Sequence, residues 1–188
     1  MDSYFELKAI PDAELLQSAV VAQLMQTVHG LLPAFEGDVG LSFPGYGQAR
    51  TLGGILRFHG GRQQLEQLSH QLCQNPTINS YALVTEVNAV PDRINGHAIF
   101  QRLHVKGESR IKRWRKHNQE NGTWTAEREQ AVTAKYRENI ICPHVALKSH
   151  STGQSRFLLF IQRRVSGEEV EGKFNAYGLS KTATVPWF

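Results

Sequence analysis

The chain has 188 residues, 40% of them hydrophobic and 20% charged, with a formal net charge of +4, which suits a globular protein with one large core or two small ones. Its two cysteines form no CxxC pair, which argues against a disulfide framework and suits a reducing compartment. The N-terminal segment shows no secretory signal pattern, and no apolar run approaches the roughly 20 residues that span a bilayer, so we expect a cytoplasmic protein without a membrane partner.

The first half of the chain predicts a β-α-β-β-α-β order of elements. Alternating apolar residues predict a strand over 4–10, and helical spacing predicts a helix over 11–30 that ends at Gly30. The remaining elements of this half are strands at 39–44, 52–60 and 80–90 and a helix at 62–73. This order is that of a ferredoxin-like domain, which we expect to cover residues 1–92.

The second half begins after the turn-rich stretch "VPDRINGH" (90–97), so we expect a second domain over 93–188. Strands are predicted at 97–105, 144–149, 156–164 and 172–180, with a basic helix over 107–118 and another helix over 124–139. The fold class predicted for the whole chain is therefore α+β.

Positive charge is concentrated in one short segment of this second half. Residues 101–117 carry a net charge of +6, whereas the rest of the chain sums to −2. Concentrated charge suggests a polyanionic partner, although a solvated helix face remains the alternative. Ile111 and Trp114 form only a narrow apolar stripe, which is too small for a membrane-bound helix. The basic residues of the segment are Arg102, Lys106, Arg110, Lys112, Arg113, Arg115 and Lys116.

Among polyanions, a short RNA stem-loop fits the pattern best. The sequence contains no helix-turn-helix spacing, zinc-finger ligand set, RNP aromatic motif or suitably placed GXXG loop. On the predicted strand over 97–105, Arg102 and His104 share one face beside the basic helix. A helix fits poorly into the deep groove of continuous A-form RNA and better near a hairpin loop or a helix end.

Two parts of the sequence carry groups suited to RNA chemistry. His29 lies at the end of the predicted helix and is either a capping residue or a general acid or base. The stretch "KSHSTGQSR" (148–156) offers Ser149, Ser151 and Thr152 for phosphate oxygens, or is a polar turn. RNA supplies its own nucleophile, the 2′-OH, so a histidine, a hydroxyl and cations suffice for cleavage.

No metal or cofactor is predicted. "CPH" (142–144) has no second ligand pair at zinc spacing, and the Gly-rich "GYGQARTLGG" (45–54) lacks the GK[ST] of a phosphate-binding loop.

Four motifs in order along the chain carry a resemblance to a known family. "HG" at 29–30, "GLSFP" at 40–44, "KSHSTGQ" at 148–154 and "YGLSK…VPWF" at the end together resemble the CRISPR repeat endoribonuclease of type I-F systems. The resemblance implies an N-terminal ferredoxin-like domain and a diverged ferredoxin-like domain with an Arg-rich helix. It also implies metal-independent cutting at the base of the repeat stem-loop by 2′-OH attack. The protein would then stay bound to the crRNA as a subunit of the interference complex.

The resemblance also implies roles for individual residues. His29 would be the general base, Ser149 would hold the reactive ribose, and Tyr177 would support the histidine. Ser151 and Thr152 would hold phosphate, and Phe157 would stack on the terminal base pair unless it is a core residue of its strand. Arg102 and residue 104 would contact bases at the bottom of the stem, but His104 stands where relatives commonly have Gln. The helix would bind the major groove through some of Arg110, Lys112, Arg113, Arg115 and Lys116.

Two alternatives remain open from the sequence. A non-catalytic subunit that binds an RNA hairpin would use the same basic helix, with His29 and Ser149 as structural residues. A basic DNA-binding regulator would prefer duplex DNA to stem-loop RNA.

Overall fold

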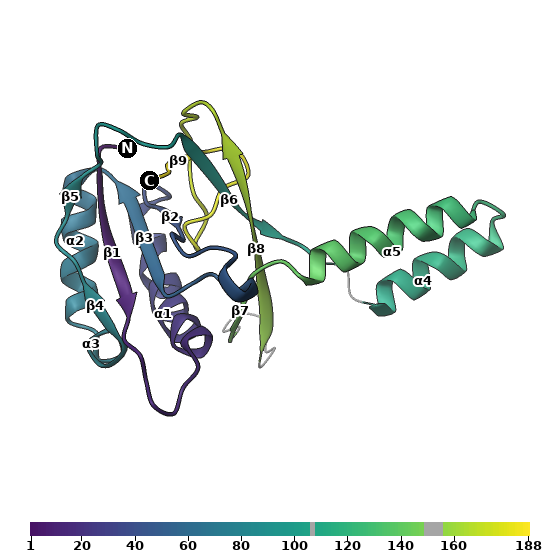
Figure 1. Cartoon of the computed structure of the whole chain (residues 1–188), viewed down its shortest axis with the longest axis horizontal. Helices are drawn as coiled ribbons and strands as arrows, with labels where there is room; N and C mark the ends of the chain where they lie inside the picture. Colours follow the sequence, from purple (N-terminus) through teal and green to yellow (C-terminus); the bar gives the residue numbers. More distant parts are fainter. Residues whose placement is uncertain (106–107, 149–155) are drawn as a thin grey trace.

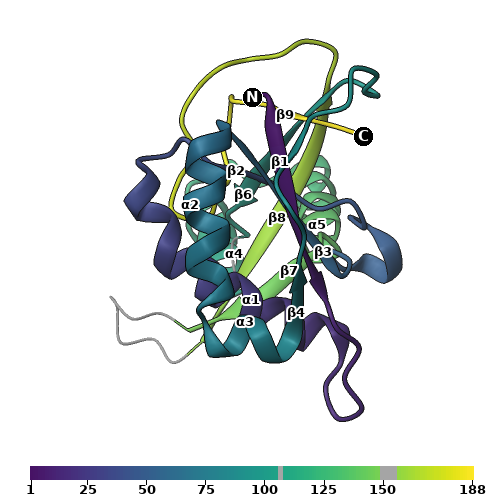
Figure 2. The ribbon, with the colours of Figure 1, turned by 90° about the vertical axis from the view of Figure 1, so that its left-hand side faces the viewer.

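The computed structural model describes residues 1–105, 108–148 and 156–188, and the backbone alone for 108–110, 135 and 137–140 (Figure 1). The chain forms two antiparallel sheets and several helices, which confirms the predicted α+β class. Figure 2 views the same ribbon with helix α2 in front and the pair of helices α4 and α5 behind the sheets.

The first sheet is built from the first half of the chain and has the order β2-β3-β1-β4, with β5 also paired to β1. Every pairing in it is antiparallel. The assignment to the ferredoxin-like class stays a prediction. The strands are β1 (Ser3–Ala9), β2 (Gly40–Ser42), β3 (Ile55–Gly60), β4 (Ala82–Val84) and β5 (Asn88–Ala89). The helices are α1 (Gln17–Leu31), α2 (Arg62–Cys73) and α3 (Pro76–Tyr81), with 3-10 turns η1 (Leu32–Phe35) and η2 (Gln48–Arg50).

The second sheet has the order β7-β8-β6-β9. Its long central pair aligns Arg102 with Ile161 and Leu103 with Phe160. The strands are β6 (His97–Leu103), β7 (His144–Leu147), β8 (Phe157–Ser166) and β9 (Val185–Pro186). Helix α1 contacts both sheets, because it packs on β1 and on β7.

One hydrophobic core joins the two sheets. Phe5 of β1 stacks on Phe58 of β3, with ring centroids 4.6 Å apart. Across the boundary between sheets, Phe43 meets Phe100 of β6 edge to face at 5.5 Å. These buried residues belong to a single cluster that draws on both halves of the chain. The division into two domains at residue 93 stays a prediction.

Helix α1 begins later than predicted, at Gln17 instead of residue 11. The Asp12 carboxylate accepts hydrogen bonds from the backbone N–H groups of Glu14 and Leu15, both at 2.8 Å. Such local side-chain bonds compete with helix formation. The helix buries Val20, Val21, Leu24, Met25 and Val28.

Helix α3 was not predicted, although its start carries a clear signal. Asn75 accepts bonds from the N–H groups of Thr77 and Ile78, and Pro76 occupies the first helical turn. An Asn cap followed by Pro is a favourable helix start. The helix takes the first two residues of the strand that was predicted over 80–90.

The strand predicted over 172–180 is wrong, because these residues form an irregular loop with a tight turn. Phe174 N–H donates to the Gly37 carbonyl at 3.0 Å, and Ser180 N–H donates to the Phe100 carbonyl at 2.9 Å. The loop therefore bonds to segments of both sheets. Phe174, Gly178 and Leu179 are buried, while residues 175–177 are partly or fully exposed.

The two remaining helices, α4 (Glu108–Glu120) and α5 (Ala126–Ile140), form an antiparallel hairpin that projects away from both sheets (Figure 1). Trp114 of α4 meets Trp124 edge to face at 5.3 Å between ring centroids. Arg115 of α4 forms an ion pair with Glu129 of α5, and Glu129 also accepts a bond from the Trp124 indole N–H at 2.9 Å. These contacts hold the two helices together.

In the described part of the chain, none of the helices combines the length and the apolar composition that crossing a bilayer requires.

Candidate functional site

The predicted residue His29 lies in the last turn of α1 and is half-buried against the loop of residues 175–179. Its Nδ1 lies 2.8 Å from the Ala176 carbonyl oxygen. A carbonyl oxygen only accepts, so Nδ1 carries the hydrogen and, in the neutral ring, Nε2 is the nitrogen with a free lone pair. The Tyr177 ring stacks on the imidazole at 4.0 Å with an interplanar angle of 11°. The structure thus presents an imidazole whose tautomer and plane are both fixed.

Arg102, Phe157 and Tyr177 come together next to this histidine. The Arg102 guanidinium carbon lies 5.5 Å from the Phe157 ring centroid and 5.9 Å from that of Tyr177. A guanidinium over aromatic faces is held by cation–π attraction. A cavity of about 270 Å³ opens here, and its lining includes Arg102, His104, Tyr177 and Lys181. The structure therefore brings His29, Tyr177, Arg102, His104 and Phe157 into one region.

The basic helix lies apart from this cluster, on the projecting hairpin (Figure 1). Lys112, Arg113 and Lys116 are exposed on α4. Arg115 is only half-exposed and pairs with Glu129, while its guanidinium lies 5.9 Å from the Trp124 ring centroid. Lys116 lies 3.8 Å from Glu120 in an exposed pair, a type that stabilises weakly.

Several predicted site residues fall outside the described residues. Ser149, Ser151 and Thr152 belong to the undescribed segment 149–155, and for Arg110 only the backbone is described, within α4. The described residues that flank the segment, Lys148 and Arg156, line a groove of about 430 Å³ together with Gln26 and other residues of α1. Lys148 N–H donates to the Gln26 side-chain oxygen at 2.8 Å, which anchors the end of β7 to α1 one turn before His29.

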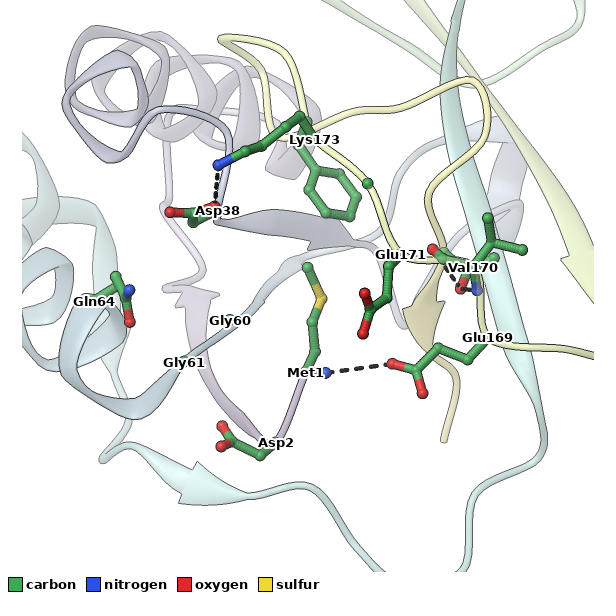
Figure 3. A pocket seen from close by; sticks show the side chains of 13 residues that line it. Met1, Asp2, Asp38, Gly60, Gly61, Gln64, Glu169, Val170, Glu171 and Lys173 are labelled. Carbon is green, nitrogen blue, oxygen red and sulfur yellow. Dashed lines mark hydrogen bonds and ion pairs between the residues drawn. The ribbon is translucent and has the colours of Figure 1, made fainter.

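A larger cavity of about 570 Å³ lies elsewhere, and its described lining includes no predicted site residue (Figure 3). Figure 3 shows Lys173 paired with Asp38 and the N-terminal amine of Met1 paired with Glu169. Most charges in this cavity are negative, which does not suit the polyanionic partner predicted from the basic segment.

Two titratable groups with shifted pKa values lie away from His29, the buried His59 and the half-buried Tyr46. Burial, reinforced by the positive charges of Arg57 and the N-terminal amine, lowers the pKa of His59 to about 3. Its Nε2 lies 2.8 Å from the Ser42 hydroxyl oxygen. Burial also raises the pKa of Tyr46 to about 12, and its hydroxyl donates to the Ile161 carbonyl at 3.0 Å.

Among the described residues, no group of three or more His, Cys, Asp or Glu side chains is arranged to hold a metal ion.

Sequence reasoning missed two residues that shape these surfaces. Asn175 closes the turn that contacts His29, and the Asn and Gly of "NAYG" signalled a turn that was interpreted as part of a strand. Glu129 neutralises Arg115, and no local signal identifies this pair, because the two residues meet only across the hairpin.

The fold and the site define an α+β protein in which a histidine of fixed tautomer contacts a turn that lines a cavity with Arg102, His104 and Lys181. Residues 4–188 match the family described as CRISPR-associated protein (Cas_Csy4), and the chain belongs to this family. A "CRISPR-associated endonuclease Cas6/Csy4" of Escherichia coli (strain UTI89 / UPEC) is 34% identical over 193 residues, covering all of both chains. A protein of the same name from Pseudomonas aeruginosa (strain UCBPP-PA14) is 29% identical over 204 residues, again covering all of both chains. The family predicted from the four motifs is confirmed.

Proposed function

We propose that this protein is an endoribonuclease that binds the stem-loop of a CRISPR repeat and cuts at the base of the stem without a metal ion. Two full-length relatives carry the name of CRISPR-associated endonucleases, which supports the nuclease activity. The observation that carries the proposal is the geometry of His29, whose Nδ1 is bonded to a carbonyl so that Nε2 is the proton acceptor.

In the proposed reaction, Nε2 of His29 takes the proton of the ribose 2′-OH. The 2′-oxygen forms a bond to the adjacent phosphorus, the bond from phosphorus to the 5′-oxygen breaks, and the 5′-oxygen takes a proton from water or from the imidazolium. The products are a 2′,3′-cyclic phosphate and a 5′-OH. The Tyr177 ring, stacked on the imidazole, keeps the ring plane aligned for this transfer.

Residues around the histidine would hold the base of the stem. The Arg102 guanidinium, supported by the rings of Phe157 and Tyr177, is suited to a guanine edge. His104 lines the same cavity and would contact the neighbouring base. Phe157 is half-buried at the start of β8, so part of its surface is available for stacking. Ser149 would hold the reactive ribose, and Ser151 and Thr152 the phosphate.

The α4 face of the hairpin would lie along the RNA groove. Lys112, Arg113 and Lys116 are exposed there, and Arg110 belongs to the same helix. Several cations on one face release counterions from a polyanion, so affinity for RNA should fall steeply with salt. Tight binding of this kind would keep the cytoplasmic enzyme on its crRNA product as a subunit of the type I-F interference complex.

The test is cleavage of labelled repeat hairpins by the full chain in excess EDTA, with His29→Ala beside wild type. We expect one cut at the stem base with a cyclic phosphate end, and a rate loss of roughly 10²- to 10⁴-fold in the variant with binding retained. His70→Ala is the control, because His70 also lies in the last turn of a helix, α2, but is exposed and lies away from the site.

Three outcomes would contradict parts of this proposal. Cleavage that stops in EDTA would overturn metal independence. Cleavage by His29→Ala at the wild-type rate would remove the histidine as the base. Tight binding with no cut by either protein would favour the non-catalytic hairpin-binding subunit.

A further inference from the structure

The imidazole of His29 is contacted by two adjacent residues of one turn, and the side chain of Asn175 closes that turn. The Asn175 side-chain oxygen accepts hydrogen bonds from the backbone N–H groups of Tyr177 at 2.8 Å and Leu179 at 3.3 Å. The backbone of Asn175 also donates to the Leu179 carbonyl and accepts from Gly178 N–H, both at 2.8 Å. All four bonds converge on one residue, so the shape of the turn depends on it.

The two residues that follow Asn175 make the contacts to His29. The Ala176 carbonyl accepts from Nδ1 at 2.8 Å, and the Tyr177 ring stacks on the imidazole at 4.0 Å. The direction of the carbonyl and the position of the ring are set by the backbone dihedrals of Ala176 and Tyr177. An Asx-turn at Asn175 fixes those dihedrals, because its side-chain oxygen binds the N–H two residues ahead.

The turn is anchored on its far side as well. Leu41 N–H of β2 donates to the Gly178 carbonyl at 2.8 Å, and Gly178 has a φ of +70°. Gly178 is buried whereas Asn175 is exposed. The exposed half of the turn, which contacts His29, therefore depends on the Asn175 side chain for its shape.

We propose that Asn175 is a positioning residue for His29. Its side-chain oxygen holds the 175–179 turn so that the Ala176 carbonyl binds Nδ1–H, which leaves Nε2 as the nitrogen that accepts the 2′-OH proton. This inference rests on the proposed function, in which His29 is the general base. Asn175 acts through the turn and does not itself contact the reacting atoms.

The experiment compares Asn175→Ala and Asn175→Ser with wild type and His29→Ala in single-turnover cleavage of the same repeat hairpin. We expect Asn175→Ala to cleave at least tenfold more slowly while its Kd for the hairpin stays within twofold of wild type. Asn175→Ser should recover much of the rate, because a serine hydroxyl makes the same turn more weakly. Asn88→Ala is the matched control, since Asn88 is also exposed and bonds a nearby backbone carbonyl at 3.0 Å, and it should cleave like wild type.

A spectroscopic measurement separates positioning from a general effect on folding. The ¹⁵N shifts of the His29 ring should report hydrogen on Nδ1 in wild type and in Asn175→Ser, and a mixture of tautomers in Asn175→Ala. A wild-type tautomer and a wild-type rate in Asn175→Ala would overturn the inference, while His29→Ala remained inactive. Full activity of His29→Ala would instead overturn the proposed function, and the ring shifts would still decide whether Asn175 fixes the tautomer.

Discussion

The loop of residues 170–184 and the α4–α5 hairpin both present polar groups, but they are held by different contacts. The loop contains the 175–179 turn, and its backbone bonds to Gly37, Leu41 and Phe100, which belong to segments far apart in the sequence. The hairpin is held by a tryptophan pair and a partly exposed ion pair between its own two helices.

This difference predicts a division of labour between the two regions. Cleavage needs atoms placed within a fraction of an ångström, which many backbone bonds and a buried surface provide. Binding to phosphates tolerates movement, because charge attraction acts over several ångströms. Substitutions near the core should therefore change stability or cleavage, and substitutions on the hairpin should change affinity.

The largest expected effect in the core is a pH dependence caused by His59. Its pKa is lowered to about 3 in the folded state, so between that pH and about 6.5 the unfolded chain binds a proton that the folded chain does not. The free energy of unfolding should then fall as the pH falls, by up to about 1.4 kcal/mol per pH unit from this group.

Denaturant unfolding of wild type and His59→Gln between pH 7 and pH 4 measures this contribution. Gln keeps a nitrogen near the Ser42 hydroxyl but does not titrate, so the variant should show a shallower slope. Equal slopes in the two proteins would mean that folding does not lower the pKa of His59.

A pair of glycine substitutions compares the two regions directly. Gly178 in the loop and Gly122 at the hairpin tip have similar positive φ values, +70° and +67°. A Cβ at Gly178 would lie 3.0 Å from side-chain atoms of Leu41, whereas a Cβ at Gly122 would meet nothing within 4 Å.

Gly178→Ala should therefore cost about 3 kcal/mol, from backbone strain plus crowding, and Gly122→Ala only about 1 kcal/mol, from strain alone. The free energy of unfolding of each variant, and its cleavage rate, provide the measurement. Equal losses of unfolding free energy in the two variants would show that the loop or Leu41 moves enough to relieve the crowding at Gly178.

The sequence was a better guide to elements with a strong local pattern than to those shaped by distant contacts. Helix α2 has the predicted bounds, because its leucines recur at helical spacing. The strand predicted over 172–180 is wrong, since Asn175 and Gly178 make a turn between the buried residues Phe174 and Leu179. The bonds that attach the loop around this turn to the two sheets reach Gly37, Leu41 and Phe100, and no local pattern indicates them.

In the candidate site as well, the sequence identified single residues but not the contacts between residues far apart in the chain. His29 was recognised at a helix end, and Tyr177 through a resemblance, but their stacking joins residues far apart in sequence. Arg115 was grouped with the other basic residues of its helix, because charge counting does not reveal the opposing Glu129. Which cations remain exposed depends on how α5 packs on α4, and that requires the structure.

On the hairpin, Lys116→Ala should weaken RNA binding without changing the cleavage rate of bound RNA. If Lys116 neutralises one phosphate, the slope of log affinity against log salt should become shallower by about one unit. Lys173→Ala is the matched control, because Lys173 is also exposed and paired with a carboxylate, that of Asp38, but lies at the acidic cavity away from the site (Figure 3). An unchanged slope in Lys116→Ala would place Lys116 outside the RNA contact.

The smallest expected effect is that of Glu129→Gln, which removes the carboxylate that faces Arg115. A partly exposed ion pair contributes at most about 1 kcal/mol, so the hairpin should lose little protection from hydrogen exchange.

RNA affinity should rise slightly in Glu129→Gln at low salt and equal that of wild type at about 1 M salt, where the Debye length is roughly 3 Å. The RNA affinity of Glu129→Gln relative to wild type shows whether Arg115 can contact RNA. A rise that Arg115→Ala abolishes would mean that Arg115 contacts phosphate once Glu129 no longer neutralises it. A fall in affinity would mean that the ion pair keeps α4 in the orientation that RNA requires.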